Sequence, residues 1–219
     1  MKLTLNTFLS LDGVMQGPGG PDEDRTGGFD RGGWVVPFVD EDFGAVVSGW
    51  FAQTDEVLLG RTTYDMMQTF WSQVTDPDDL VATVLDTRPK HIVSTTLRDP
   101  SWHNSSVIAG DVVAAVEQLK ARPGGELQVH GSCGLAHTLH DAGLIDEYRL
   151  IIFPVVVGGG KRLFHDGCVP GSLTLVDTTV TPKGAVALTL QPAGSLGVGD
   201  IDVIDGREVI DGREVTRTA

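Results

Sequence analysis

The stretch from Val129 to Phe164 constrains the fold of this chain more than any other part of the sequence. A short apolar run, Glu126 to Val129, ends abruptly at Gly131-Ser132, and apolar residues at helical spacing follow it. A second β-rich run, Tyr148 to Val157, is too apolar to face water on both sides and is closed by three glycines. Strand, glycine turn, helix and strand in this order predict a βαβ unit.

The glycine turn of this unit predicts an anion-binding site. A tight turn leaves unpaired backbone N–H groups at the start of a helix, where the helix dipole is positive, and such a place binds phosphate. A second arrangement of the same kind follows the predicted strand Glu56 to Leu59, where Gly60-Arg61-Thr62-Thr63 opens another helix. We predict that the two turns bind one dinucleotide between them.

The hydroxyl residues after a third predicted strand, Lys90 to Ser94, extend this pattern. Ser94-Thr95-Thr96 stands at the carboxyl end of the strand, where ligands bind in open α/β sheets. The remaining elements that we expect are a first strand at Lys2 to Leu9, helices at Asp40 to Phe51 and Val112 to Arg122, a possible short helix within Pro77 to Asp86, and a hairpin of Leu173 to Thr181 with Ala185 to Gln191.

The segment from Gly13 to Gly33 is glycine-rich and too long for a simple connection. We expect a mobile loop that serves as a lid, anchored by Phe29 and Trp34, and Trp34 is the aromatic residue that we expect to meet the substrate.

Composition excludes several classes of partner. The net charge of −14 argues against nucleic acid and anionic membrane surfaces, because both attract basic patches. No apolar run approaches the ~20 residues of a membrane-spanning helix, and the N-terminus lacks a cleavage pattern. Two cysteines form neither a disulfide framework nor a zinc motif, so we expect a reducing, cytoplasmic compartment.

Several phrases of the sequence resemble the dihydrofolate reductase-like superfamily. They are SLDG at Ser10 to Gly13, LLGRTTYD at Leu58 to Asp65, VSTTL at Val93 to Leu97, and VHGSCGLAHTL with GLIDEYRLIIFPVVVGGGKRLF within Val129 to Phe164. They look like the branch that contains the RibD-type C-terminal reductase domain of riboflavin biosynthesis and its stand-alone relatives. The phrases occur in the expected order and cover about residues 2 to 192, the last one being the most specific.

The resemblance implies an α/β three-layer sandwich, with a mostly parallel central sheet and a C-terminal antiparallel hairpin. It also implies NADPH as hydride donor and a flat heterocycle as acceptor. Asp12, with Leu11 and Gly13 beside it, falls at the nicotinamide and substrate end, where it is the candidate catalytic residue. The cofactor positions that the resemblance implies are Gly60, Arg61, Thr62 and Thr63 for phosphates, Ser94 and Thr95 near the 2′-phosphate, and Gly131, Ser132, Cys133, Gly134 and Leu135 under the pyrophosphate.

Local chemistry leaves alternatives for three of these residues. Asp12 is either a substrate anchor or a turn-forming residue before Gly13, and the proton of the reduction comes from water or from Asp12. Arg61 pairs with a phosphate or with a surface carboxylate. Cys133 is a small residue packed beneath the cofactor rather than a nucleophile, and we expect no metal site among Cys133, His137 and His140.

The sequence therefore predicts an NADPH-dependent reductase of a pyrimidine- or pteridine-like heterocycle, most like 5-amino-6-(5-phosphoribosylamino)uracil reductase. The alternatives are dihydrofolate reductase-type activity and a non-catalytic NADP-binding module. The resemblance implies that a dihydrofolate reductase has a buried carboxylate in the helix before the Gly-Arg motif. The helix at Asp40 to Phe51 has acidic residues only in its first turn, which disfavours dihydrofolate as the substrate. We expect residues 1–194 to form the reductase domain of a homodimer. Residues 195–219, with IDGREV twice, form an acidic tail that is a solvated extension or a dimer clasp.

Overall fold

The computed structural model describes residues 1–204, 207–211 and 213–214. Its main sheet has eight strands in the order β4-β3-β2-β5-β1-β6-β8-β7. The first six are parallel to their neighbours, and β8 and β7 are antiparallel, which confirms the predicted mostly parallel sheet with a terminal hairpin. The strands are β1 (Lys2–Ser10), β2 (Thr54–Gly60), β3 (Lys90–Val93), β4 (Ser105–Ile108), β5 (Glu126–His130), β6 (Glu147–Phe153), β7 (Leu173–Val180) and β8 (Val186–Pro192).

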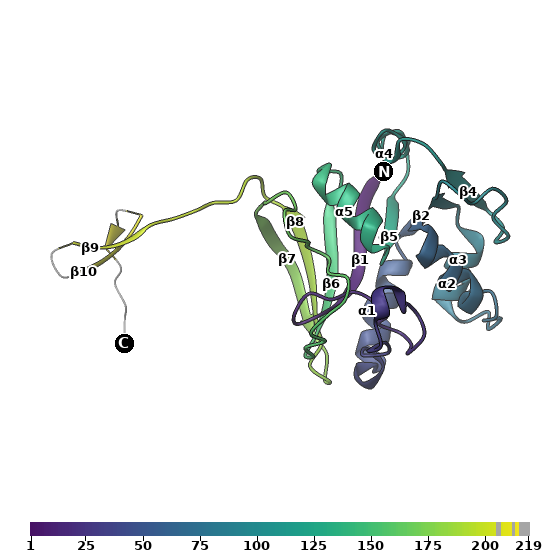
Figure 1. The fold of residues 1–219 in the computed structure, drawn as a ribbon, viewed down its shortest axis with the longest axis horizontal. Coiled ribbons are helices and arrows are strands. Elements are labelled where there is room, and N and C mark those ends of the chain that lie inside the picture. Colours follow the sequence, from purple (N-terminus) through teal and green to yellow (C-terminus); the bar gives the residue numbers. More distant parts are fainter. Residues whose placement is uncertain (205–206, 212, 215–219) are drawn as a thin grey trace.

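Helices cover both faces of this sheet and make three layers (Figure 1). Alternate residues of β2 show how the layers pack: Leu58 joins the apolar core under α4 and α5, whereas Val57 and Leu59 join the core under α1, α2 and α3. The helices are α1 (Glu41–Phe51), α2 (Arg61–Trp71), α3 (Leu80–Thr87), α4 (Val112–Lys120) and α5 (Cys133–Asp141), with short 3₁₀ turns at Thr26–Gly28 and Val36–Phe38.

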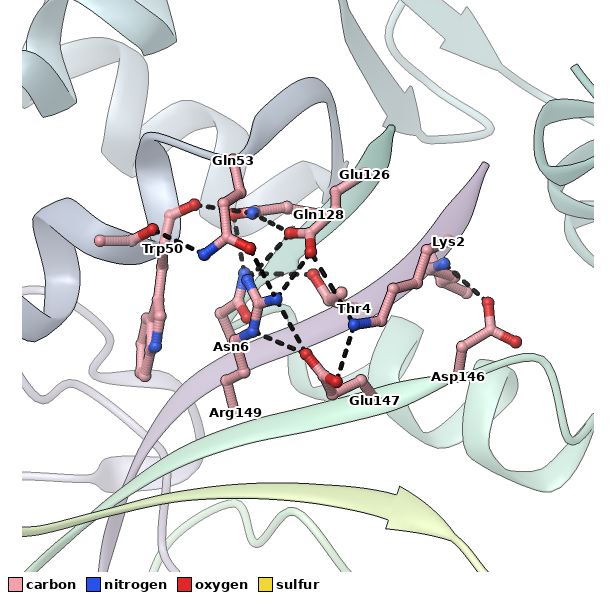
Figure 2. A network of polar contacts seen from close by, with 12 residues as sticks. Lys2, Thr4, Asn6, Trp50, Gln53, Glu126, Gln128, Asp146, Glu147 and Arg149 are labelled. Atoms are coloured by element: carbon pink, nitrogen blue, oxygen red, sulfur yellow. Dashed lines mark hydrogen bonds and ion pairs between the residues drawn. The ribbon is translucent and has the colours of Figure 1, made fainter. Parts of the chain in front are cut away.

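A buried polar network joins β1, β5 and β6 on the α1 side of the sheet (Figure 2). The Arg149 guanidinium donates two hydrogen bonds to Glu126, of 2.6 and 2.9 Å, and its Nε donates to Glu147 at 2.9 Å. Lys2 pairs with Glu147 at 2.7 Å, and the Gln128 amide donates to Glu126 at 2.7 Å. Two cations balance two carboxylates, and removing Arg149 would leave Glu126 and Glu147 buried with only the partly exposed Lys2 to balance them.

The structure corrects the sequence at three places in the main domain. Strand β4 was not predicted, because its serines hide the apolar pattern of a short edge strand. Strand β6 ends at Phe153 instead of Val157, since Pro154 has no N–H group to continue the ladder. The predicted mobile lid, Gly13 to Gly33, is instead folded against the segment that follows β6.

The tail contains a second, three-stranded antiparallel sheet, β9 (Ile201–Ile204), β10 (Arg207–Ile210) and β11 (Arg213–Glu214). Figure 1 shows β9 and β10 set apart from the main sheet at the end of an extended segment. A solvated extension or a dimer clasp was expected here, and this sheet was not predicted from the sequence. The duplicated IDGREV prediction also covers residues 205–206, 212 and 215, which lie outside the described residues.

Candidate functional site

The predicted site residues come from four strands that are neighbours in the sheet. Ser94 follows β3, Gly60 ends β2, Gly131 follows β5, and Asp12 follows β1, in the sheet order β3-β2-β5-β1. Because these strands are parallel, all four segments leave the sheet at the same, carboxyl edge. The structure therefore gathers segments that are far apart in the sequence at the place where open α/β sheets bind ligands.

The two glycine turns lie in direct contact. The Gly60 N–H donates a hydrogen bond of 2.9 Å to the Ser132 hydroxyl. A Cβ atom on Gly60 would lie 3.5 Å from the Ser132 Cβ, and one on Gly131 would lie 3.9 Å from the Thr63 Cγ2. Gly131 has a φ of 54°, a conformation that glycine adopts without strain. The starts of α2 and α5 thus meet at one point of the carboxyl edge.

These two helices are also the ones whose first turns are left open. Aspartate side chains cap α1, α3 and α4, where Asp40, Asp79 and Asp111 accept a hydrogen bond from the first helical turn. No side chain caps α2, which begins after Gly60, or α5, which begins after Ser132. The first-turn N–H groups at residues 61–63 and 133–135 are therefore available at the positive ends of two helix dipoles.

Arg61 begins α2 and pairs with Asp65 one turn later, at 2.7 Å. Both side chains are substantially exposed, so this ion pair contributes about 0–1 kcal/mol and exchanges easily for a phosphate. The structure is thus compatible with both predictions for Arg61, which were pairing with a phosphate and pairing with a surface carboxylate.

Ser94 lies beside this turn, because the last pair between β2 and β3 is Gly60 with Val93. Its buried hydroxyl accepts hydrogen bonds from the N–H groups of Thr96 and Leu97, at 3.3 and 3.1 Å, and so shapes its own turn. Thr95 is exposed at the same place.

Asp12 anchors the glycine-rich segment that follows β6. Its carboxylate accepts hydrogen bonds from the N–H groups of Val157, at 2.9 Å, and Gly158, at 2.8 Å. The Ser10 hydroxyl donates to it at 2.7 Å. These hydrogen bonds, that of Ser10 first, hold the pKa of Asp12 well below its usual range. A carboxylate in this state accepts hydrogen bonds and holds no proton to give away.

The predicted lid is held in place by Gln16, a buried residue that sequence reasoning missed. Its amide nitrogen donates to the carbonyl oxygens of Asp24 and Thr26, at 3.1 and 3.0 Å, and its amide oxygen accepts from the N–H of Lys161 at 3.0 Å. Lys161 also pairs with Asp24 at 2.6 Å. A single glutamine in a glycine-rich stretch has no sequence signature, so nothing in the pattern could have identified it.

Trp34 packs as part of this folded loop. Its indole N–H donates to the carbonyl oxygen of Gln16 at 2.9 Å, and its ring meets Phe153 edge-on at 5.8 Å. Leu11, by contrast, is 68% exposed, and Gly13 has a φ of 79° in the turn that carries Asp12. The substrate-facing role of Leu11, Gly13 and Trp34 stays a prediction.

Cys133 is packed rather than activated. Burial raises the pKa of its thiol, and its Sγ lies 3.4 Å from the His137 Nε2. His137 in turn contacts the carbonyl oxygen of Arg162 at 2.8 Å. Within residues 1–204, 207–211 and 213–214, no three His, Cys, Asp or Glu side chains are grouped so as to hold a metal ion.

A cavity of about 270 Å³ lies elsewhere, between α1 and strands β6 to β8. Glu147 and Arg149 of the buried polar network line it, and both stand at the amino end of β6. The cavity is therefore separate from the carboxyl edge where the predicted site residues meet.

Comparison with known proteins places the fold and the family. The model of the RibD C-terminal domain matches residues 1–187, which confirms the predicted resemblance. The uncharacterized protein YyaP of Bacillus subtilis (strain 168) is 28% identical over 190 residues, which is 85% of this chain and 93% of YyaP. None of the helices in the described part of the chain has the length and apolar character to cross a membrane.

Two solved structures share the fold. A protein from Shewanella sp. PV-4 that is named for riboflavin biosynthesis has a TM-score of 0.62 and 21% identity, covering 88% of this chain and 99% of its own. Dihydrofolate reductase from Enterococcus faecalis, in complex with NADP(H) and RAB-propyl, has a TM-score of 0.55 and 13% identity, covering 88% of this chain and 96% of its own. The predicted dihydrofolate reductase-like sandwich is thereby confirmed.

Proposed function

Since the chain belongs to the RibD C-terminal domain family, we propose that it is an NADPH-dependent reductase of a pyrimidine- or pteridine-like heterocycle. The activity to which we compare it is that of 5-amino-6-(5-phosphoribosylamino)uracil reductase. NADPH would supply the hydride, and the protein would align two flat rings and exclude water from between them.

The observation that carries the proposal is the contact between two open helix starts. Gly60 and Ser132 are 72 residues apart in the sequence, and their hydrogen bond holds the first turns of α2 and α5 side by side. Aspartates cap the other three α-helices, so among the α-helices that the structure describes only the two that meet at this edge lack a capping side chain. A dinucleotide presents several phosphate groups within a short span, and two adjacent helix N-termini offer matching N–H donors.

The residues at this edge fit NADPH. Gly60 and Gly131 present no side chain where a pyrophosphate would approach the backbone. Arg61 is held only by a weak surface pair, so its guanidinium is available to a 2′-phosphate, the group that distinguishes NADPH from NADH. The NADP(H) bound by the Enterococcus enzyme is consistent with this assignment.

We assign the proton of the reduction to water rather than to Asp12. The Asp12 carboxylate is ionised and engaged by two backbone N–H groups and a hydroxyl. Its role in this proposal is to hold Val157 and Gly158 beside the end of β1. The hydride acceptor then gains its proton from solvent that reaches the open edge.

The test is a comparison of NADPH and NADH binding by wild type and Arg61→Ala. Losing charge-assisted hydrogen bonds to the 2′-phosphate should weaken NADPH binding roughly tenfold or more, with little change for NADH. Arg122→Ala is the matched control, because Arg122 is similarly exposed (45% against 40%) and pairs with Glu56 away from this edge. Equal changes for both nucleotides in Arg61→Ala would refute the 2′-phosphate assignment.

Turnover separates the reductase from a non-catalytic NADP-binding module. NADPH oxidation is followed with the phosphoribosylaminouracil intermediate, simple pterins and dihydrofolate as acceptors. Oxidation above background with one of them supports the reductase, and good turnover of dihydrofolate selects that alternative. NADPH binding with no turnover of any acceptor would favour the module.

We also propose that the protein is a homodimer that pairs along the β7 edge. Every residue of β7 is exposed, including Leu175 at 52%, Val176 at 53% and Val180 at 65%. Apolar edge strands of this kind are usually covered. Light scattering should give the dimer mass for wild type and the monomer mass for Leu175→Lys, and a monomeric wild type would exclude the proposal.

A further inference from the structure

We propose that Ser132 is a positioning residue, whose hydroxyl fixes the start of α2 against the start of α5 and does not itself bind phosphate. This inference rests on the proposed function and deepens it, because it names what holds the two halves of the nucleotide site together. It also changes the role that the family resemblance implies for Ser132, which was that of a direct cofactor contact.

The backbone of Ser132 turns its side chain away from the usual capping position. Its φ of 56° and ψ of 57° are left-handed, a conformation that a residue other than glycine seldom adopts. A serine at the N-cap normally accepts a hydrogen bond from its own helix, but Ser132 makes none to α5. Its hydroxyl instead bonds to Gly60 at the end of the neighbouring strand.

The hydrogen bond between Gly60 and Ser132 lies just beyond the last backbone pair of β2 and β5. Strands β2 and β5 pair in register up to Leu58 and Val129, and the chain then turns at Gly131. Beyond that pair, β5 continues only to His130, and β2 and β5 share no further register pair. The Ser132 hydroxyl is the acceptor that Gly60 uses, at 2.9 Å. The two strands therefore stay coupled beyond their last backbone pair.

The proton of the same hydroxyl is already engaged within the protein. It donates that proton to the carbonyl oxygen of His130, at 3.1 Å, while it accepts from Gly60. A hydroxyl has one proton, so a hydrogen bond from Ser132 to an incoming anion would have to replace the one that it donates to His130. Ser132 can thus hold the site in shape without contacting the ligand.

The consequence concerns ligands that touch both turns. The N–H groups at residues 61–63 belong to α2, and those at 133–135 belong to α5. If the hydroxyl fixes their separation, its removal should weaken a ligand bound across both turns and also reduce the contribution of Arg61 to that ligand. A direct phosphate contact by Ser132 would instead act independently of Arg61.

The experiment is a double-mutant cycle in the full-length protein with Ser132→Gly and Arg61→Ala, measured as the dissociation constant of NADPH. Glycine removes the hydroxyl and suits the left-handed backbone, so strain does not confuse the result. We expect Ser132→Gly to raise the constant about tenfold. Arg61→Ala should then add less than about threefold in that background, against roughly tenfold in wild type.

Amide hydrogen exchange at Gly60 gives a second readout that needs no ligand. The exchange should quicken at least about tenfold in Ser132→Gly. Thr69→Ala is the matched control, because it removes a hydroxyl that bonds only within α2, to the Asp65 carbonyl oxygen at 2.8 Å, and it should leave both readouts unchanged.

The outcomes separate this inference from the proposed function. Additive effects of Ser132→Gly and Arg61→Ala, agreeing within about twofold, would overturn the positioning role while leaving NADPH binding intact. An unchanged exchange rate at Gly60 would overturn it as well. A wild-type protein that binds no NADPH would overturn the proposed function, and the Gly60 exchange rate would still decide whether Ser132 couples the two turns.

Discussion

His130, the last residue of β5, should make the protein sensitive to mild acid. The imidazole is buried directly before the turn at Gly131 and stacks on Phe51 with ring centres 4.3 Å apart. Burial, and then the charge of Arg149, lowers the pKa of His130 to about 3. The folded protein therefore keeps this histidine neutral at a pH where the unfolded chain protonates it.

The sign and size of the effect follow from these two pKa values. With a pKa of about 6.5 in the unfolded chain and about 3 in the fold, the unfolded state binds more protons as pH falls below 6.5. As far as His130 is concerned, the free energy of unfolding is thus highest above pH 6.5 and decreases as the pH falls toward 3. Between pH 8 and pH 5 the free energy of unfolding should fall by about 2 kcal/mol through His130 alone.

The assay compares urea unfolding of wild type and His130→Phe at pH 8 and pH 5. Phenylalanine keeps the stack on Phe51, and the Gln128 amide oxygen that His130 contacts still receives the Asn6 amide at 2.9 Å. Carboxylates titrate alike in both proteins, so the difference between the two pH slopes isolates the histidine. An exposed control, His103→Gln, should behave as wild type. Equal losses in wild type and His130→Phe, within about 0.5 kcal/mol, would refute the reasoning.

Three further predictions concern the rest of the molecule. Lys90→Met should destabilise the fold by about 2–4 kcal/mol in urea unfolding, because the buried ammonium of Lys90 donates to the carbonyl oxygens of Leu85, at 2.6 Å, and Arg88, at 3.0 Å, at the end of α3. Asp12→Asn should lower turnover without removing a limb of the pH–rate profile, since Asp12 anchors backbone N–H groups; a lost limb would restore it as the proton donor. A chain ending at residue 194 should keep the thermal unfolding midpoint and NADPH affinity of the full protein, and a large loss in either would reject the predicted division into domain and tail.

Much of the fold could be predicted because its signals are local. The glycine that ends β2 and the glycine after β5 each mark the point where an apolar strand gives way to a helix, and both were found from the sequence. The hairpin of β7 and β8 was found from Pro182 and Gly184 between two β-rich runs. Parallel pairing then brings the predicted site segments to one edge without further information.

What could not be predicted depends on contacts between distant segments. The roles of Asp12 and Ser132 follow from partners 145 and 72 positions away, Val157 and Gly60. No local pattern distinguishes an aspartate that binds a substrate from one that holds a loop. The packing of the loop around Gln16 escaped for the same reason, because its glycines favour flexibility until a buried amide ties them down.

The open start of α2 implies that a substitution of Gly60 that raises thermal stability would lower activity. Gly60 has a φ of −73° and a ψ of 155°, which any residue can adopt, and a Cβ there would make ordinary contacts at 3.5 Å. An aspartate at this position would therefore close the helix as in α1, α3 and α4, and should raise stability by about 1 kcal/mol. Its carboxylate would also occupy the place of the proposed phosphate, so we expect that engineering for heat resistance at this residue yields a more stable protein that no longer binds NADPH.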